Sequence, residues 1–347
     1  MKLPTPLLFR SINHSFLVLI ATFLLATGIQ AFSFPPKEQQ LTVEVVNYII
    51  NNQYDSAFTA IHRFPQSSGD PLPALLHLAV LGMRDVDFEQ IIDSTRFLKS
   101  YDSASALLAA WELQKGESSY TRMLSGMCKA IHAAFYIRQK RYVNAMQNGF
   151  SALDDLREAQ ELDSTNYEVD FFLGLYEYAR AELRSRLWWV LFWYPGNRQR
   201  GIEKVRRCAE NAILTGDAAM LSLCDMYIQE KRPDDALKYL NILKKNHPSS
   251  RFVLWAEVKY LESRENFSAA AEKYGNLNAL YANEQYGEFN TLTTAIKQAT
   301  MLYKSGDASD AIAICDKLLH SKNINNYKDL KKETVKLSER CNAADNR

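Results

Sequence analysis

Two adjacent stretches of the chain repeat one pattern of small, aromatic and aliphatic residues. In the first, Cys224 and Tyr227 precede Ala236; in the second, Ala270 stands 34 positions after Ala236 and is followed by Tyr274. Apolar residues spaced three or four apart lie on one face of a helix. A small residue on that face lets a second helix approach closely. The pattern therefore predicts two short amphipathic helices in each stretch, crossing at the small residue.

The spacing and the order of residue types resemble the tetratricopeptide repeat, a helix-turn-helix unit of about 34 residues. The resemblance gives Cys224, Tyr227 and Ala236 the small, large and small positions at which its helices pack, and Pro248 ends the unit. Weaker copies share the spacing. They lie around Val45, Tyr48 and Ala57; Ala79, Gly82, Ile91 and Leu98; Ala133, Tyr136 and Ala145; Gly174 and Glu177, continuing at Gly201 and Val205; and Ala299, Leu302, Ala311 and Leu318.

One helical hairpin cannot bury its apolar face alone, so stacked copies are needed to form a continuous core. We therefore expect an all-α fold, an α-solenoid of about seven tetratricopeptide-like hairpins over residues 41–322 with an aromatic insertion at 181–200. A short linker, 32–40, precedes it, and a C-terminal helix with a charged tail that frays near Arg340 occupies 323–347. Hairpin-turn and alternating strand patterns are nearly absent. A helical bundle or another solenoid without true repeats is the alternative.

Residues 1–31 have the pattern of a secretory signal peptide. Lys2 and Arg10 are followed by an apolar run over 16–25, and Ile29-Gln30-Ala31 offers a cleavage site. The run is shorter than the about 20 apolar residues that span a bilayer comfortably. We predict export to the periplasm or cell envelope; an uncleaved inner-membrane signal anchor is the alternative.

The charge balance gives no reason to expect nucleic-acid binding. The chain has 41 Lys and Arg against 40 Asp and Glu, and removal of Lys2 and Arg10 with the leader leaves 39 against 40, a net charge of −1. No basic stripe appears along the sequence. The predicted partners are therefore a protein or peptide, with peripheral membrane contact as an alternative, and no nucleic acid.

The sequence predicts no catalytic, cofactor or metal site. The six His residues form no HExxH or HxH pair, and no GxSxG, Walker or GxGxxG motif occurs. The five Cys form no CxxC; Cys224 and Cys315 fall at core positions of the repeat, and a disulfide between Cys208 and Cys224 is the less favoured alternative to buried free thiols. His132, between apolar residues of a predicted helix, is expected to be structural. An enzyme would need acids or His residues that converge from separate repeats.

The insertion at 181–200 departs from plain repeat structure because three of the five Trp lie within six of its residues. Its candidate partner-binding residues are Trp188, Trp189, Trp193, Tyr194, Arg198 and Arg200. The aromatic run either fills the interior of the solenoid, binds a partner or contacts a membrane surface. The stretch from Gly174-Leu175 to Gly196-Asn197-Arg198-Gln199-Arg200-Gly201-Ile202 also resembles a short motif of the inclusion-body-clearance family of solenoid proteins, with Asn197 in place of its Asp and Ile202 in place of its Leu.

In tetratricopeptide proteins the first helix of each hairpin lines the concave face, where extended peptides dock. Carried over by phase, the resemblance implies three candidate binding residues on this face, Asp225, Trp255 and Lys259, with Gln229, Glu262, Arg138 and Tyr178 also exposed there. Their mixed charge shows no uniform basic clamp for a carboxylate tail. We therefore predict a non-catalytic interaction scaffold of the cell envelope. The alternative is an envelope-assembly factor that uses the Trp-rich insertion at the membrane surface.

Overall fold

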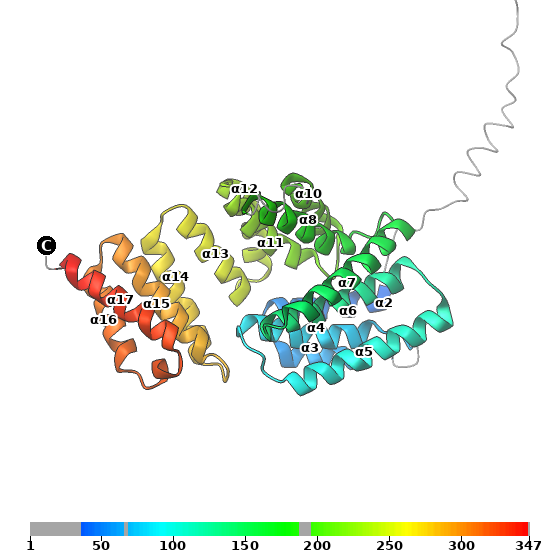
Figure 1. Cartoon of the computed structure of the whole chain (residues 1–347), viewed down its shortest axis with the longest axis horizontal. Coiled ribbons are helices and arrows are strands. Elements are labelled where there is room, and N and C mark those ends of the chain that lie inside the picture. The colour runs from blue at the N-terminus through cyan, green and yellow to red at the C-terminus, as the bar shows by residue number, and fades with distance from the viewer. Residues whose placement is uncertain (1–35, 66–68, 187–195, 346–347) are drawn as a thin grey trace, which may run out of the picture. The chain divides into compact units, whose positions relative to one another are not determined.

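The computed structural model describes residues 36–65, 69–186 and 196–345, and within these ranges all regular structure is helical (Figure 1). The described helices pair in chain order into seven antiparallel hairpins, which confirms the predicted all-α solenoid. Their bounds are α2 (Pro36–Ile50) with α3 (Tyr54–Ile61), α4 (Leu72–Asp87) with α5 (Ser94–Lys115), α6 (Ser119–Arg138) with α7 (Tyr142–Leu162), α8 (Glu168–Arg186) with α10 (Arg198–Asn211), α11 (Gly216–Gln229) with α12 (Pro233–Asn246), α13 (Arg251–Ser263) with α14 (Phe267–Ala282), and α15 (Glu288–Ser305) with α16 (Ala308–His320).

The small residues of the repeat pattern lie where helices cross. Ala236 and Ala270 are fully buried, as are Cys224 and Tyr274 to within 1% of their surface. The two backbones of the fourth hairpin approach closely: a Cβ on Gly174 of α8 would lie 2.7 Å from Val205 Cγ2 and 2.8 Å from the Gly201 carbonyl oxygen of α10. Only glycine permits that separation. Each hairpin also packs on the next one, so the core continues along the chain.

The turns inside the hairpins repeat one backbone conformation. A single residue with positive φ joins the two helices in six of the seven, at Asn52, Glu89, Lys140, Lys231, Glu265 and Gly306. In five of these turns the next residue's N–H donates to a carbonyl five positions earlier, as for Arg232 to Tyr227 at 2.8 Å. This pattern is the Schellman motif, which satisfies the free carbonyls at a helix end. Lys231 and Glu265 are 34 residues apart, so the turn follows the period of the sequence pattern.

Two expected positions differ in the structure. Ile91, expected inside the second helix of its hairpin, lies in the turn, because α5 begins only at Ser94 with the Asp93 side chain accepting from the Arg96 N–H at 2.9 Å. The helix α2 begins at Pro36, inside the expected linker 32–40, and Pro is a residue type favoured in the first helical turn.

The last helix stabilises the C-terminal end. A short 3₁₀ helix (Asn323–Asn326) leads into α17 (Lys328–Asp345), which passes Arg340, where we expected fraying. Cys341 is fully buried beside Cys315 and Leu337 in a common cluster with α15 and α16. That contact covers the apolar face of the seventh hairpin and explains why the helix continues.

Candidate functional site

A cleft opens on the face made by the first helices of the hairpins, and it has two parts. The polar chamber has a volume of about 560 Å³ and collects residues from α4, α6, α11, α13 and α15, together with Tyr281 of α14 (Phe267–Ala282). Its lining residues are Val86, Asp87, Glu89, Arg138, Leu221, Ser222, Asp225, Phe252, Trp255, Ala256, Lys259, Tyr281, Thr293 and Lys297.

The three candidate residues predicted for this face meet in the polar chamber. Lys259 of α13 donates to both carboxylate oxygens of Asp225 of α11, at 3.0 and 2.8 Å, and their side chains remain 49% and 41% exposed. The indole N–H of Trp255 donates to the Tyr281 hydroxyl at 3.0 Å. An ion pair this exposed contributes little to stability, so both charges are available to a partner.

The apolar chamber lies beside it and has a volume of 220 Å³. Most of its wall is aliphatic or aromatic and comes from α2, α4, α6, α8 and the start of α11. The lining residues are Val46, Ile49, Ile50, Leu75, Leu76, Ala79, Gly82, Met83, Asp85, Val86, Phe97, Met127, Ile131, Ala134, Phe135, Arg138, Phe171, Phe172, Leu214, Thr215 and Ala218. A cavity of about 150 Å³ with such walls stays dry and binds benzene.

Arg138, at the end of α6, lines both chambers together with Val86. Its guanidinium is half-buried, and within the described residues no carboxylate lies within 4 Å of it. Burial lowers the pKa of Arg138, while the more distant Asp85 and Glu89 act in the opposite direction. A partly desolvated guanidinium with free donors is a binding group for a carboxylate or carbonyl oxygen.

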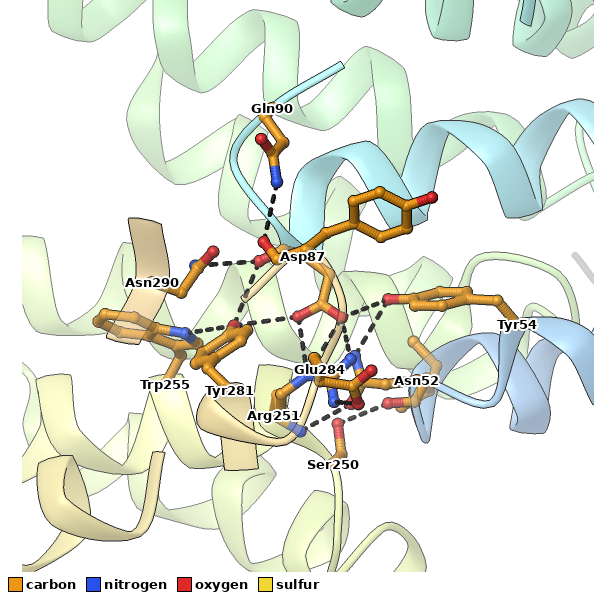
Figure 2. A network of polar contacts seen from close by, with 12 residues as sticks. Asn52, Tyr54, Asp87, Gln90, Ser250, Arg251, Trp255, Tyr281, Glu284 and Asn290 are labelled. Atoms are coloured by element: carbon orange, nitrogen blue, oxygen red, sulfur yellow. Dashed lines mark hydrogen bonds and ion pairs between the residues drawn. The ribbon is translucent and has the colours of Figure 1, made fainter. Parts of the chain in front are cut away.

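The wall of the polar chamber rests on a buried ionic network centred on Asp87 and Arg251 (Figure 2). The Arg251 guanidinium donates to both Asp87 oxygens, with Nε 3.1 Å from each, and its Nη1 lies 2.5 Å from Glu284. The hydroxyls of Tyr54 and Tyr281 donate to the same carboxylate at 2.8 and 3.0 Å. The Asp87 carboxylate is therefore satisfied by donors from two other hairpins, as a buried charge requires.

Further hydrogen bonds extend this network along the hairpin turns. The Ser250 hydroxyl donates to the Ile50 carbonyl at 2.5 Å, and the Arg251 N–H donates to the Asn52 side chain at 2.8 Å. The Asn290 amide donates to the Asp87 carbonyl at 3.2 Å. These bonds join the first two hairpins to the last two, although their residues are far apart in sequence.

Only part of the predicted insertion lies within the residues that the structure describes. Trp188, Trp189, Trp193 and Tyr194 lie outside the described residues. Arg198 and Arg200 begin α10, where Arg198 pairs with Glu182 at 2.5 Å and with Glu230 at 3.6 Å, and Arg200 is exposed. The structure does not bring these two arginines into either chamber.

One residue expected on the exposed face is buried instead. Tyr178 of α8 keeps only 6% of its surface, because α10 packs directly against it across Gly201, and its hydroxyl donates to Glu230 at 3.0 Å. Gln229 is exposed, and Glu262 accepts from the Tyr274 hydroxyl. Neither lines the polar chamber.

The five Cys thiols and His132 are buried in the core. All five Cys are buried and free, so Cys208 and Cys224 are not bonded to each other; the Cys208 sulfur lies 3.1 Å from the Thr215 hydroxyl. His132 is buried with its ring 3.7 Å from that of Tyr101 and 4.3 Å from that of Tyr136. Among the described residues, no group of three or more His, Cys, Asp or Glu is placed to hold a metal ion.

Sequence reasoning missed the apolar chamber. Its residues are ordinary helix-face residues, and nothing local distinguishes an aliphatic side chain that lines a cavity from one that fills a core. The small residues Ala79 and Gly82 on α4 and Ala134 on α6 were the only sequence signal for a cavity, because small side chains on facing helices leave space between them. The Asp87–Arg251 network was missed for a different reason: its partners are separated by 164 positions.

Fold and cleft together define a helical-repeat protein of stacked antiparallel hairpins with a two-part cleft on its first-helix face. No protein-family model matches the chain, and no curated protein matches it, so neither family resemblance is assigned. Among solved structures, the crystal structure of yeast Tom70 is similar with a TM-score of 0.39 and 12% sequence identity, covering 98% of this chain and 76% of that one. A similarity this remote assigns no partner and no activity.

Proposed function

We propose that this protein is a non-catalytic scaffold of the tetratricopeptide type that binds a protein or peptide partner in the cleft on its first-helix face. One observation supports the proposal most: the first helices of all seven hairpins contribute charged, aromatic or apolar side chains to two chambers that share Val86 and Arg138. Half-buried Trp255 and Arg138 are of the residue types that dominate binding energy in protein interfaces. Such a surface recognises an extended segment and needs no chemical step.

Site-specific photocrosslinking in the native host tests this proposal. A benzophenone amino acid replaces Lys259 in the polar chamber. In the control it replaces Lys245, another exposed lysine, near the end of α12 and outside the chamber lining. We expect ultraviolet light to crosslink discrete proteins to position 259 and to leave position 245 without them. No crosslink at 259, or the same proteins at both positions, would contradict binding in the cleft.

We also propose that the protein works in the cell envelope after export, on the basis of the leader pattern in residues 1–31, which lie outside the described residues. No described helix is long and apolar enough to cross a membrane. The mass of the protein purified from its native host tests the location: cleavage after Ala31 is expected. A chain that keeps residues 1–31 and sediments with the inner membrane would favour the signal anchor instead.

A further inference from the structure

The two chambers of the cleft differ sharply in chemistry and meet at a single side chain, which restricts what can occupy both. The apolar chamber offers 220 Å³, somewhat more than the roughly 150 Å³ that holds a benzene molecule. It therefore has room for one large apolar side chain, such as that of Phe or Leu. Ala79 and Ala134 line it while remaining partly exposed, so an apolar group could enter without displacing the core.

The charges around Arg138 favour an acidic neighbour for that apolar group. In the polar chamber Asp87 is paired with Arg251 and Asp225 with Lys259. Among the described residues, Arg138 and Lys297 have no carboxylate within 4 Å. Glu89 is the one acid of the chamber lining that has no cation within that distance.

Asp85 also faces this region, from the wall of the apolar chamber. Its carboxylate accepts the Ile92 N–H at 3.1 Å, and burial raises its pKa. Burial therefore works against the charge of Asp85, and the lining of the polar chamber holds two cations outside the ion pairs, Arg138 and Lys297, against one such acid, Glu89. A carboxylate of the partner would meet the Arg138 donors, an arrangement that gives the strongest class of hydrogen bond.

We infer that the cleft recognises a segment of protein chain in which a large apolar side chain stands next to a carboxylate, with the apolar side chain in the apolar chamber and the carboxylate on Arg138. The inference rests on the proposed function and names the chemistry of its partner. A peptide suits the site better than an acyl chain, because the polar chamber continues beyond Arg138 with the hydroxyls of Ser222 and Thr293 in its lining, and the Thr293 hydroxyl has no hydrogen-bond partner among the described residues.

Binding of defined peptide pools to the purified chain, followed by fluorescence anisotropy, tests the inference. Three pools of capped, labelled hexapeptides hold Phe beside Glu, Phe beside Gln, or Ala beside Glu, and are random elsewhere. The Phe-Glu pool is expected to bind roughly 10- to 100-fold more tightly than the other two, the gain typical of a charge-assisted hydrogen bond and of a buried apolar side chain.

Variants separate the two contacts. Ala134→Phe, or the smaller Ala79→Ile, fills the apolar chamber and should remove the preference for Phe, whereas Ala110→Phe on the exposed face of α5 should not. Arg138→Gln should remove the preference for Glu, and Arg138→Lys should keep part of it. Glu89→Gln should strengthen Phe-Glu binding, because it removes a nearby negative charge.

Several results would overturn the inference. They are equal binding of the three pools, binding of none of them, or a Phe-Glu preference that survives in both Ala134→Phe and Arg138→Gln. Decanoate is the probe for the other amphiphile: if it binds with dependence on Arg138 while no pool binds, the site takes an acyl chain. Crosslinks at position 259 would still support the proposed function in each of these cases, so the two failures are distinguishable.

Discussion

Asp87→Asn should destabilise the protein strongly, because it removes the charge that compensates buried Arg251. The two side chains are 0% and 6% exposed, so neither is solvated by water. The amide cannot accept at both positions, which leaves the Arg251 guanidinium with Glu284, itself 39% exposed, as its remaining anion. Breaking a buried ion pair from one side costs about 3–5 kcal/mol.

Urea unfolding followed by circular dichroism measures this cost, with Asp225→Asn as the control. The Asp225–Lys259 pair is 41% and 49% exposed, so its loss should cost no more than about 1 kcal/mol. Because the network joins the first two hairpins to the last two, Asp87→Asn should also broaden the transition, as expected when distant repeats unfold less cooperatively. Equal costs for the two variants would refute the reasoning, as would full additivity of Asp87→Asn with Arg251→Met.

Three further predictions concern the core. Gly174→Ala should cost about 1–3 kcal/mol by overpacking α8 against α10, whereas Gly149→Ala, with nothing within 4 Å of its added Cβ, should not destabilise α7 in the same urea assay. Burial lowers the pKa of His132, so the unfolded chain binds the proton at a higher pH than the folded protein does. Stability should therefore fall as the pH drops below about 6.5, until His132 of the folded protein is also protonated. His132→Phe should reduce that dependence. Burial raises the pKa of Cys128 to about 11 and of Cys224 to about 12, so the five free thiols should resist a thiol reagent at pH 8 in the native state and all react in urea; fewer than five in urea would reveal a disulfide.

The hairpins were predictable from sequence because their crossings need small residues at fixed spacing. Ala236 and Ala270 are fully buried at such crossings. The turns were less predictable from sequence. A left-handed backbone conformation is usually adopted by Gly or Asn, but here it is adopted by Glu89, Lys140, Lys231 and Glu265. At Lys140, Lys231 and Glu265 the Schellman hydrogen bonds, and not the side chain, hold the turn, so the identity of the residue does not reveal its conformation.

The candidate site was predictable only in part. Helical phase places Asp225, Trp255 and Lys259 on one face, and the structure gathers these three in the polar chamber. Phase alone could not show that Tyr178 is covered by α10, since the cover comes from the close packing of α10 on α8 at Gly201. It also could not show the apolar chamber, which depends on how five helices from different hairpins pack together.

The most direct test of the central claim is affinity capture from the native envelope, read by mass spectrometry, with three forms of the chain. These are the natural sequence, a cleft variant with Arg138→Glu and Lys259→Glu, and a form in which 187–195 is replaced residue for residue by a Gly-Ser linker. The account predicts that the cleft variant loses the partners that the linker form retains. Partners retained by the cleft variant and lost with 187–195 would contradict it, and would assign recognition to the aromatic insertion.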